Sequence, residues 1–348
     1  MVELETFLGI DYPTLWYLVV GLLFSGYAIL EGFDYGAGAW HLFLKKDLSR
    51  RIAINAIGPL WDANQVWLII GGGALFAGFP VMYATMLSAM YIPFMLFLVL
   101  LVLRSSAIKF RSAEEMNWWR KTWDIIYFIS NTLIAFLLGV VLGNVLQGFE
   151  IGENFSYKGG IFFAFLSPYA IMVGLTTLSI FMTQGAIFLL LKTEGRLYER
   201  LTFLLKKGMI FFIISFAITS LYTLVFLPGV IDKFKEFPVF FVLPILAFLA
   251  VANVPRLVSK KKYANALVFS SLTMAFLLML VAFQLYPVLL PSTIDSKFSV
   301  TIYNAASSQK SLGIMLNIVL IGAPLLAGYF LFLYKTFNGK VKLDDTSY

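Results

Sequence analysis

Nine apolar segments, each long enough to cross a lipid bilayer as a helix, follow one another along the chain. A helix needs about 20 residues to span a hydrocarbon core of about 30 Å. Short polar stretches separate the segments, so we expect an all-α polytopic membrane protein in which residues 1–348 form a single integral membrane domain. Nine helices fit two four-helix bundles plus one further helix. The segments lie at residues 15–44, 56–78, 80–103, 122–147, 160–191, 208–228, 237–255, 264–290 and 311–334.

The composition excludes most soluble functions. Hydrophobic residues make up 60% of the chain and charged residues 13%, whereas soluble proteins carry about 25% charged residues. The chain has 0 Cys, which excludes disulfides, thiolate metal sites and a cysteine nucleophile. A net charge of +7 would suggest a nucleic-acid partner in a soluble domain, but in a membrane protein the placement of the charges matters more. We therefore expect no nucleic-acid partner.

The basic residues predict the orientation of the helices. Of the 26 Lys and Arg residues, 21 fall in the loops after the first, third, fifth and seventh segments or in the C-terminal stretch, and five fall on the opposite side. Cytoplasmic loops carry the excess of Lys and Arg in membrane proteins. This distribution predicts an external N-terminus, a cytoplasmic C-terminus and an odd number of spans.

Four acidic residues inside or at the start of the apolar segments are the leading functional candidates: Glu31, Asp34, Asp62 and Asp124. Charge inside a membrane is costly and usually functional. By helical rise, Asp124 lies about 5 Å from the inner face, Asp62 and Asp34 about 16 Å and Glu31 about 21 Å. We interpret the four as a proton pathway, with Asp34 and Asp62 paired across two helices. The alternative is that Glu31 or Asp34 pairs with a basic residue such as Arg104 and only fixes packing.

Glycine, tryptophan and histidine carry weaker signals. Helix packing is the simpler interpretation of the glycines at small-xxx-small spacing or in a cluster, namely Gly32, Gly36, Gly71, Gly72, Gly73, Gly139 and Gly143. Trp61 and Trp67 lie deep in the second segment, where packing and a role beside a partner's cofactor are equally open. His41 is the one histidine. We interpret it as an interfacial residue that reaches for water rather than a haem ligand, and we expect no metal site in this chain.

Several motifs, taken together, resemble subunit II of the cytochrome bd-type quinol oxidases. The most specific are Glu31-Gly-Phe-Asp34-Tyr-Gly36-Ala-Gly38, Gly58-Pro-Leu-Trp61-Asp62-Ala-Asn64-Gln65-Val-Trp67, and Gly72-Gly-Ala-Leu-Phe-Ala-Gly-Phe-Pro80. Arg104, Trp123-Asp124, Gly143-Asn144 and Thr183-Gln184-Gly185-Ala186 follow in the same order. The resemblance covers the whole chain and is most specific in residues 1–150, the first four helices, with residues 151–348 forming helices five to nine.

The resemblance implies a terminal oxidase of aerobic respiration in the prokaryotic cytoplasmic membrane. Its partner subunit I would carry two haems b and haem d, oxidise menaquinol or ubiquinol, and reduce dioxygen to water. This chain would ligate no cofactor and would be active only with subunit I. It would brace the partner, line a cytoplasmic proton-uptake path with Asn64, Gln65, Trp61, Trp67 and Arg104 in support, and contact membrane lipid or quinone. A small third subunit of one helix is a further expected partner.

This sequence departs from the family pattern at three positions. Glu31 stands where Asp is frequent, Ala63 where Gly is frequent, and Gln65 where some members have Glu. The loss of a carboxyl at residue 65 leaves more of any proton transfer to Asp62. A proton-coupled secondary transporter is the alternative function, although transporters usually show broken helices in both halves. A purely structural membrane subunit is the third interpretation.

Overall fold

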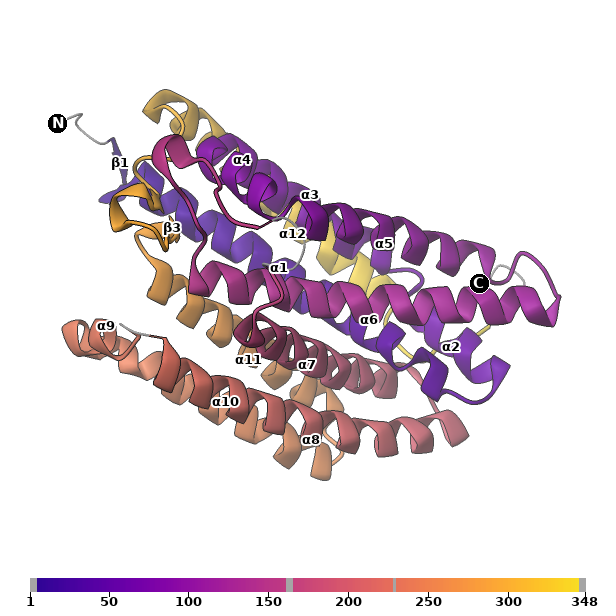
Figure 1. Ribbon diagram of the computed structural model, residues 1–348. Helices are drawn as coiled ribbons and strands as arrows, with labels where there is room; N and C mark the ends of the chain where they lie inside the picture. Colours follow the sequence, from indigo (N-terminus) through magenta and orange to yellow (C-terminus); the bar gives the residue numbers. More distant parts are fainter. Residues whose placement is uncertain (1–4, 161–164, 228–229, 344–348) are drawn as a thin grey trace.

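The computed structural model describes residues 5–160, 165–227 and 230–343, and it is a bundle of long, roughly parallel and antiparallel helices (Figure 1). Its first half consists of β1 (Thr6–Phe7), β2 (Ile10–Asp11), α1 (Tyr12–Ala39), η1 (His41–Phe43), α2 (Asp47–Ile57), α3 (Trp61–Gly78), α4 (Pro80–Ala89), α5 (Tyr91–Phe110) and α6 (Asn117–Gln147). The second half consists of η2 (Glu153–Phe155), α7 (Pro168–Lys192), α8 (Gly195–Phe226), α9 (Val230–Glu236), η3 (Pro238–Phe241), α10 (Val242–Ser259), α11 (Tyr263–Leu285), β3 (Val288–Leu290), η4 (Ser296–Phe298), β4 (Val300–Thr301) and α12 (Gln309–Thr336).

The predicted set of membrane spans is confirmed when one bent pair of helices is counted as a span. Eight helices of the described chain are long and apolar enough to cross a membrane, and α3 with α4 forms a further pair bent by 116°. Several predicted boundaries were wrong: the segment 80–103 is split between α4 and α5, the segment 56–78 begins in α2, and α8 begins at Gly195, before the predicted segment 208–228. The chain breaks at Phe79 and again at Met90. Pro80 begins α4 because a proline has no N–H to contribute and fits the first helical position.

The break after α3 leaves carbonyl groups that another part of the chain satisfies. The Ser307 amide donates to Gly78 O at 2.9 Å, and the Ser307 hydroxyl donates to Ala77 O at 2.5 Å. A backbone group without a partner would be costly at membrane depth. The segment before α12 therefore stabilises the bend between α3 and α4.

The helices group around α1 and α7. Within the first half, α1 packs on α3 and α6, and α5 packs on α6; within the second, α7 packs on α8 and α11, and α10 packs on α11. Contacts of α7 with α1 and α6 join the halves. A Cβ added to Gly36 would lie 1.7 Å from Phe181 O, and one added to Gly185 would lie 2.3 Å from Ala37 N. Only glycine allows the α1 and α7 backbones to approach this closely.

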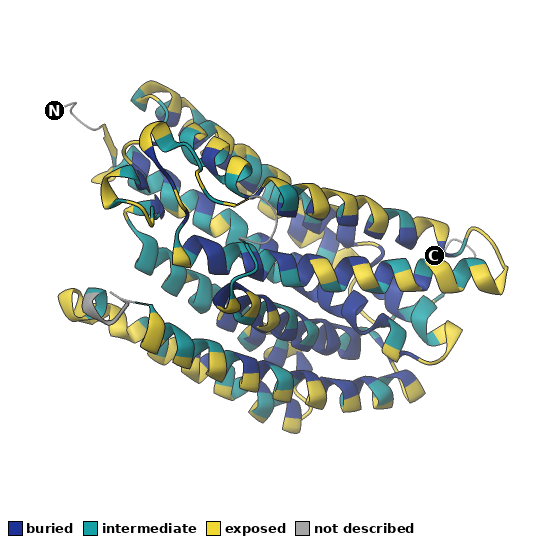
Figure 2. Cartoon of the chain, viewed as in Figure 1, coloured by how far each residue is buried: buried dark blue, intermediate teal, exposed yellow. Residues whose placement is uncertain are grey.

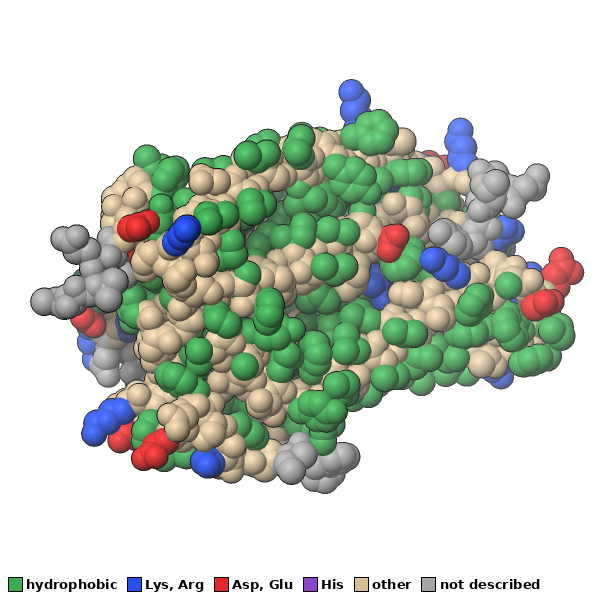
Figure 3. All heavy atoms as spheres, turned by 90° about the horizontal axis from the view of Figure 1, so that it is seen from above, with side chains coloured by type: hydrophobic (Ala, Val, Ile, Leu, Met, Phe, Trp, Pro, Cys, Tyr) green, Lys and Arg blue, Asp and Glu red, His purple; other side chains and the backbone are tan. Residues whose placement is uncertain are grey.

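The surface of the bundle is apolar in the middle and charged towards the ends. Large exposed hydrophobic side chains follow α8 and α10, which form one outer side of the bundle (Figure 2). On the face shown in Figure 3, hydrophobic side chains cover the middle and most charged side chains lie near the two ends. This pattern is that of a protein whose long sides face lipid.

The two ends of the bundle differ in charge and in structure. One end holds α2, the turn between α5 and α6 and the residues that follow α12; the other holds β1, β3 and α9 (Figure 1). We call the first of these the basic end, because it contains residues 41–57 and 111–121 with their Lys and Arg side chains. There the C-terminal segment covers the turn between α7 and α8: the Val341 amide donates to Lys192 O at 3.0 Å, and Lys340 Nζ donates to Thr193 O at 2.8 Å.

Candidate functional site: two buried polar clusters

Three charged side chains meet in the middle of the first half. Glu31 and Asp34 are three positions apart on α1 and therefore share a face of the helix, and Arg104 reaches them from α5. Their exposed fractions are 0%, 0% and 1%. Arg104 Nη1 lies 2.9 Å from Glu31 Oε2, and Arg104 Nη2 lies 3.7 Å from Asp34 Oδ2. One guanidinium thus faces two carboxyl groups in an interior that is otherwise apolar. We call this group the carboxylate cluster.

Neutral polar side chains from three helices surround the carboxylate cluster. The Asn64 amide, on α3, donates to Asp34 Oδ2 at 3.0 Å, and the Tyr334 hydroxyl, on α12, donates to Asn64 Oδ1 at 2.9 Å. Arg104 Nη1 also lies 3.4 Å from Gln65 Oε1. The Arg104 guanidinium stands 4.6 Å from the centre of the Tyr35 ring, a cation–π contact. The cluster is therefore held by α1, α3, α5 and α12.

The carboxylate cluster has more hydrogen-bonding capacity than its protein neighbours use. Within the described chain, both oxygens of Glu31, Asp34 Oδ1, and Arg104 Nε and Nη2 are buried and have no aligned hydrogen bond. An unpaired buried polar group costs about 1–3 kcal/mol. Such groups are suited to bind water, which requires two to four polar partners. The site can therefore support proton exchange between carboxyl groups and water.

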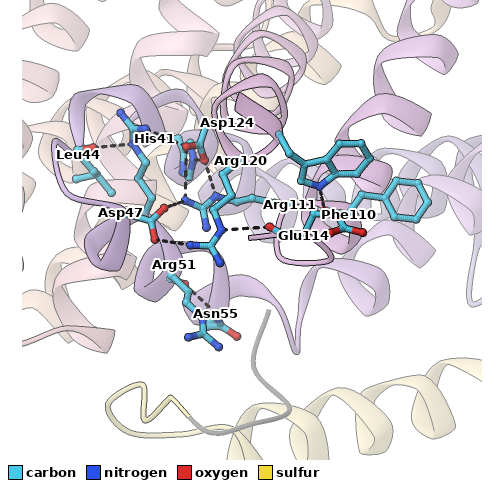
Figure 4. A network of polar contacts seen from close by, with 12 residues as sticks. His41, Leu44, Asp47, Arg51, Asn55, Phe110, Arg111, Glu114, Arg120 and Asp124 are labelled. Carbon is cyan, nitrogen blue, oxygen red and sulfur yellow. Dashed lines mark hydrogen bonds and ion pairs between the residues drawn. The ribbon is translucent and has the colours of Figure 1, made fainter. Parts of the chain in front are cut away.

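A second polar network lies at the basic end and centres on Asp124 of α6 (Figure 4). Asp124 is 1% exposed. Its Oδ1 lies 2.5 Å from His41 Nε2 and 2.5 Å from Arg111 Nε, and its Oδ2 lies 2.9 Å from Arg50 Nη1. Arg111 Nη2 in turn lies 2.5 Å from Asp47 Oδ1. We call these five residues the Asp124 network.

The Asp124 network connects the surface with the interior. The Asp47 side chain is 53% exposed, whereas those of Arg111 and Asp124 are each 2% exposed. Burial opposes the charge of Arg111, but the hydrogen bond to Asp124 and the nearby Asp47 carboxylate outweigh it and raise the pKa of the guanidinium. Two guanidinium groups beside one carboxylate favour its ionised form. The network is therefore a charged clamp that ties the end of α1, α2 and α6 to the residue following α5.

His41 lies beyond the end of α1, inside this clamp, and its interpretation as a water-seeking interfacial residue was wrong. It is 0% exposed and packs edge-on against the Tyr127 ring, with 5.0 Å between ring centres. Burial lowers the pKa of His41, and Arg111 and Arg50 add to this effect, whereas Asp124 opposes it. The imidazole is thus mainly neutral near pH 7. A partner within the chain, not the membrane interface, explains its position.

Tyr127 lies between the two clusters. It follows Asp124 by three positions on α6 and is 1% exposed. Its hydroxyl is within electrostatic range of Arg104, Asp34 and Glu31, and it has no hydrogen-bond partner in the described part of the chain. Its ring touches His41 of the Asp124 network. Tyr127 thus contacts the clamp at the basic end and interacts electrostatically with the carboxylate cluster.

Asp62 does not take the predicted position beside Asp34. The structure places the Asp62 side chain in the first turn of α3 and exposed, and the α3 side chain that contacts Asp34 is Asn64. Two residues on a helix differ by about 200° in direction, so Asp62 and Asn64 point to opposite sides. Asp62 is within electrostatic range of Glu31 instead. The predicted Asp34–Asp62 pair is therefore wrong, and a proton-transfer role for Asp62 stays a prediction.

The tryptophans and glycines named in the sequence analysis differ in how closely they pack against other helices. The Trp61 ring lies 5.9 Å from the Arg104 guanidinium, and Trp67 packs against Phe330. Cβ atoms added to Gly32, Gly139 and Gly143 would come within 3.0 Å of another helix. Gly71 has ordinary contacts, and no atom of the described chain lies within 4 Å of a Cβ placed on Gly72 or Gly73. Close packing at Gly72 and Gly73 thus does not occur within this chain.

Sequence reasoning missed two central residues of the site. Arg111 was counted among loop residues, and nothing in its sequence context distinguishes a buried arginine from a solvated one. Tyr127 carried a usable signal, because it lies three positions after Asp124 and so on the same face of α6. Asn131 and Ser130 continue that buried face by one more turn.

The comparisons with known proteins agree along the whole chain. Residues 12–337 match the family described as cytochrome bd terminal oxidase subunit II. Cytochrome bd-I ubiquinol oxidase subunit 2 of Escherichia coli (strain K12) is 32% identical over 369 residues, which cover 97% of each chain. Cytochrome bd ubiquinol oxidase subunit 2 of Bacillus subtilis (strain 168) is 33% identical over 332 residues, which cover 94% of this chain and 96% of the relative.

The fold of the chain is also found in a solved structure. A chain in the solved structure of bd oxidase from Geobacillus thermodenitrificans superposes with a TM-score of 0.74 at 20% sequence identity. The superposition covers 94% of this chain and 98% of that chain, so the two share the fold over nearly their full lengths. The chain belongs to the cytochrome bd terminal oxidase subunit II family.

Proposed function

We propose that this chain is the subunit II of a quinol oxidase in the cytoplasmic membrane. It would work with a subunit I that oxidises quinol and reduces dioxygen to water. The family match over residues 12–337 carries this proposal, and the relatives in Escherichia coli and Bacillus subtilis are both described as ubiquinol oxidase subunits. A proton-coupled transporter is not favoured, because the match extends over the entire bundle.

The cofactors belong to the partner subunit in this proposal, as two haems b and one haem d. His41 is poorly suited to be an axial haem ligand, because its Nε2 is bound to Asp124 and the ring is buried between that carboxylate and Tyr127. In the described ranges no group of three or more His, Cys, Asp or Glu side chains could hold a metal ion. Haem supplies the oxygen chemistry, and the polar groups of this chain handle protons.

The acidic residues would form the proton-uptake path. We place its mouth at the basic end, which the distribution of Lys and Arg assigns to the cytoplasm. Asp124 would stand at the mouth. Asp34 and Glu31, which face the Arg104 guanidinium and keep oxygens without an aligned hydrogen bond, would accept protons in the interior. The exposed Asp62 carboxyl, in electrostatic range of Glu31, would pass them out of this chain to the partner.

Further contacts of the subunit are with lipid and with small partners. An apolar cavity of about 220 Å³ lies between α1, α3, α4, α5 and α6, with Phe24, Tyr83 and Phe97 among its lining residues. A lipid acyl chain or the tail of a quinone would suit this cavity, because its lining is almost wholly apolar. The exposed apolar side of α8 and α10 would accept lipid or a third subunit of one helix.

Purification of the tagged chain from its native membrane tests the proposed function. We expect a haem-bearing partner of similar size to co-purify and the complex to consume oxygen when quinol is supplied. The lone chain should show no stoichiometric haem absorbance and no turnover. A lone chain that catalyses substrate uptake into vesicles would instead establish the transporter.

A further inference from the structure

We propose that His41 and Tyr127 connect the Asp124 network to the carboxylate cluster and carry protons between them. This inference rests on the proposed function, since it concerns protons consumed by the oxidase. It assigns the transfer of protons from the Asp124 network to the carboxylate cluster to two residues that are not acidic. The route from the mouth to Asp34 then passes along α6 and does not involve the exposed Asp62.

The chemistry of His41 follows from its partner. An ionised carboxylate only accepts hydrogen bonds, so the 2.5 Å contact with Asp124 places the proton of the neutral imidazole on Nε2. Nδ1 therefore presents a lone pair. It is buried and has no hydrogen-bond donor in the described chain. A carboxylate on one nitrogen orients the ring and stabilises the imidazolium that forms when the other nitrogen takes a proton.

Taken together, the charges around His41 favour the neutral imidazole, so the ring would carry an added proton only transiently. Asp124 of α6 favours the imidazolium, whereas Arg50 of α2 and Arg111 after α5 oppose it, and Tyr127 is neutral. Burial and the two guanidinium groups lower the pKa of His41. The imidazole thus does not hold a proton at rest near neutral pH. A relay group must release a proton as readily as it accepts one.

Tyr127 and the next turn of α6 provide the inward continuation. The Tyr127 hydroxyl can both donate and accept, and it lies in electrostatic range of Asp34 and Glu31. The Ser130 hydroxyl and the Asn131 side-chain oxygen also lack partners in the described ranges, although both residues are buried. Unpaired polar atoms that follow one helix face are suited to a file of water molecules. The file would end at the unpaired oxygens of the carboxylate cluster.

The transfer requires only protons and water. His41 Nδ1 takes a proton from a hydronium ion, forming an N–H bond and leaving water. It then gives this proton to the Tyr127 oxygen, either directly or through a water that passes one of its own protons to that oxygen, while the Tyr127 hydroxyl releases its own proton towards Asp34. Each residue returns to its starting form, and the net change is one proton moved inward. The proton is finally consumed when oxygen is reduced in the partner subunit.

A purely structural role for His41 is the competing explanation, because the same contact with Asp124 holds the end of α1 against α6. Two substitutions separate the alternatives in the intact oxidase complex. His41→Gln keeps an amide donor for Asp124 but cannot take up a proton. Tyr127→Phe removes one hydroxyl and keeps the packing against His41. Tyr263→Phe is the matched control, since it removes the hydroxyl of another buried tyrosine, which accepts a hydrogen bond from Tyr198 at 3.1 Å.

The experiment measures haem content and the rate of quinol-driven oxygen consumption from pH 5.5 to 8.5. We expect His41→Gln and Tyr127→Phe to keep haem and to slow turnover by about 10- to 100-fold at pH 8. The deficit should shrink towards pH 5.5, where hydronium is more abundant. Imidazole added to His41→Ala should restore part of the rate. Tyr263→Phe should match the wild type at every pH.

The outcomes distinguish this inference from the proposed function. If the wild-type complex consumes no oxygen with quinol, the proposed function fails. If it is active and both variants follow the wild-type pH profile, the relay is overturned and the function stands. If His41→Gln loses haem, Tyr127→Phe decides: a pH-dependent deficit supports the relay, and wild-type turnover overturns it.

Discussion

The two halves of the bundle treat buried polar groups differently. In α7 and α8 the polar side chains are neutral and bond to each other across the helix interface, with hydroxyl pairs at 2.8–3.0 Å: Thr176–Thr219, Ser179–Ser215 and Tyr169–Thr223. Gln184 likewise accepts from Ser270 at 2.9 Å. In α1, α5 and α6 the buried polar groups include charged and aromatic side chains beside neutral ones such as Ser130 and Asn131, and several buried atoms have no hydrogen-bond partner within the described chain.

This difference in hydrogen bonding indicates that α7 and α8 support the structure, whereas α1, α5 and α6 form the candidate site. Satisfied hydroxyl pairs hold two membrane helices together and leave nothing for a ligand or a proton. Buried charged groups and buried polar atoms without a hydrogen bond reduce stability, and proteins keep them where function requires them. In the described part of the second half, the unpaired side-chain atoms belong to Gln284 and Gln309, near the β-strand end. Four substitutions test this division, and they follow in order of expected effect.

Arg104→Leu should cause the largest loss. It removes the guanidinium that faces Glu31 and Asp34, and breaking a buried ion pair from one side costs about 3–5 kcal/mol. We expect little assembled complex in the membrane, measured by haem and by the amount of this chain. Arg120→Leu is the control, because the Arg120 side chain is 33% exposed and surface pairs contribute about 0–1 kcal/mol. Normal assembly of Arg104→Leu would mean that the first half is held together by packing alone.

Gly36→Ala should cause the next largest loss, because it forces apart the helices that join the two halves. The added Cβ would lie 1.7 Å from Phe181 O, and overpacking of this kind costs about 1–3 kcal/mol. The melting temperature of the purified complex measures the effect. Gly72→Ala, where the described chain has no atom within 4 Å, should leave this chain's own fold unchanged. Loss of the partner in Gly72→Ala would place that glycine at the subunit interface.

His41→Gln should change how stability depends on pH. The pKa of His41 is lowered in the folded protein, chiefly by burial, so the unfolded chain binds a proton more readily below about pH 6.5. Acidification through this range therefore destabilises the wild type, and the penalty is absent above it. Glutamine does not titrate, so the melting temperature of His41→Gln should fall less between pH 7.5 and 5.5. Equal slopes would show that the pKa of His41 is the same in the folded and the unfolded chain, and a steeper fall in His41→Gln would show that folding raises it.

Ser179→Ala should have the smallest effect and should leave oxygen reduction unchanged. Hydrogen bonds between membrane helices contribute about 0.6 kcal/mol on average, and Ser215 keeps a second acceptor, Phe211 O, at 2.8 Å. A double-mutant cycle with Ser215→Ala measures the coupling. If Ser179→Ala slowed turnover as strongly as Tyr127→Phe, the second half would share the proton chemistry and the comparison would fail.

Hydropathy and charge predicted the spans and the acidic residues, because length along a helix determines depth in a membrane. Glu31, Asp34 and Asp124 were found in this way, and each is buried. Arg104 lies at the end of an apolar segment, and this position made it possible to propose Arg104 as a partner of Glu31 or Asp34. The depth of a residue in the membrane depends on how many residues separate it from the end of its helix, and this number can be read from the sequence.

Direction around the helix axis could not be predicted with the same success. Asp62 and Asn64 have nearly the same depth, but they point to opposite sides, and only packing decides which side meets Asp34. His41 and Arg111 lie where basic side chains normally reach for water. Their burial depends on Asp124 from another helix. Contacts of this kind arise from three-dimensional packing, which a single sequence does not specify.

The C-terminal segment has a consequence for biosynthesis. Lys340 donates to carbonyl groups at the turn between α7 and α8, and 150 residues separate it from Leu190, one of the acceptors. At about 5–20 residues per second, a ribosome needs roughly 8–30 s to make that interval. Until then the turn between α7 and α8 lacks these partners. The basic end can therefore close only after Lys340 has been synthesised, and until then the inserted helices lack these hydrogen bonds.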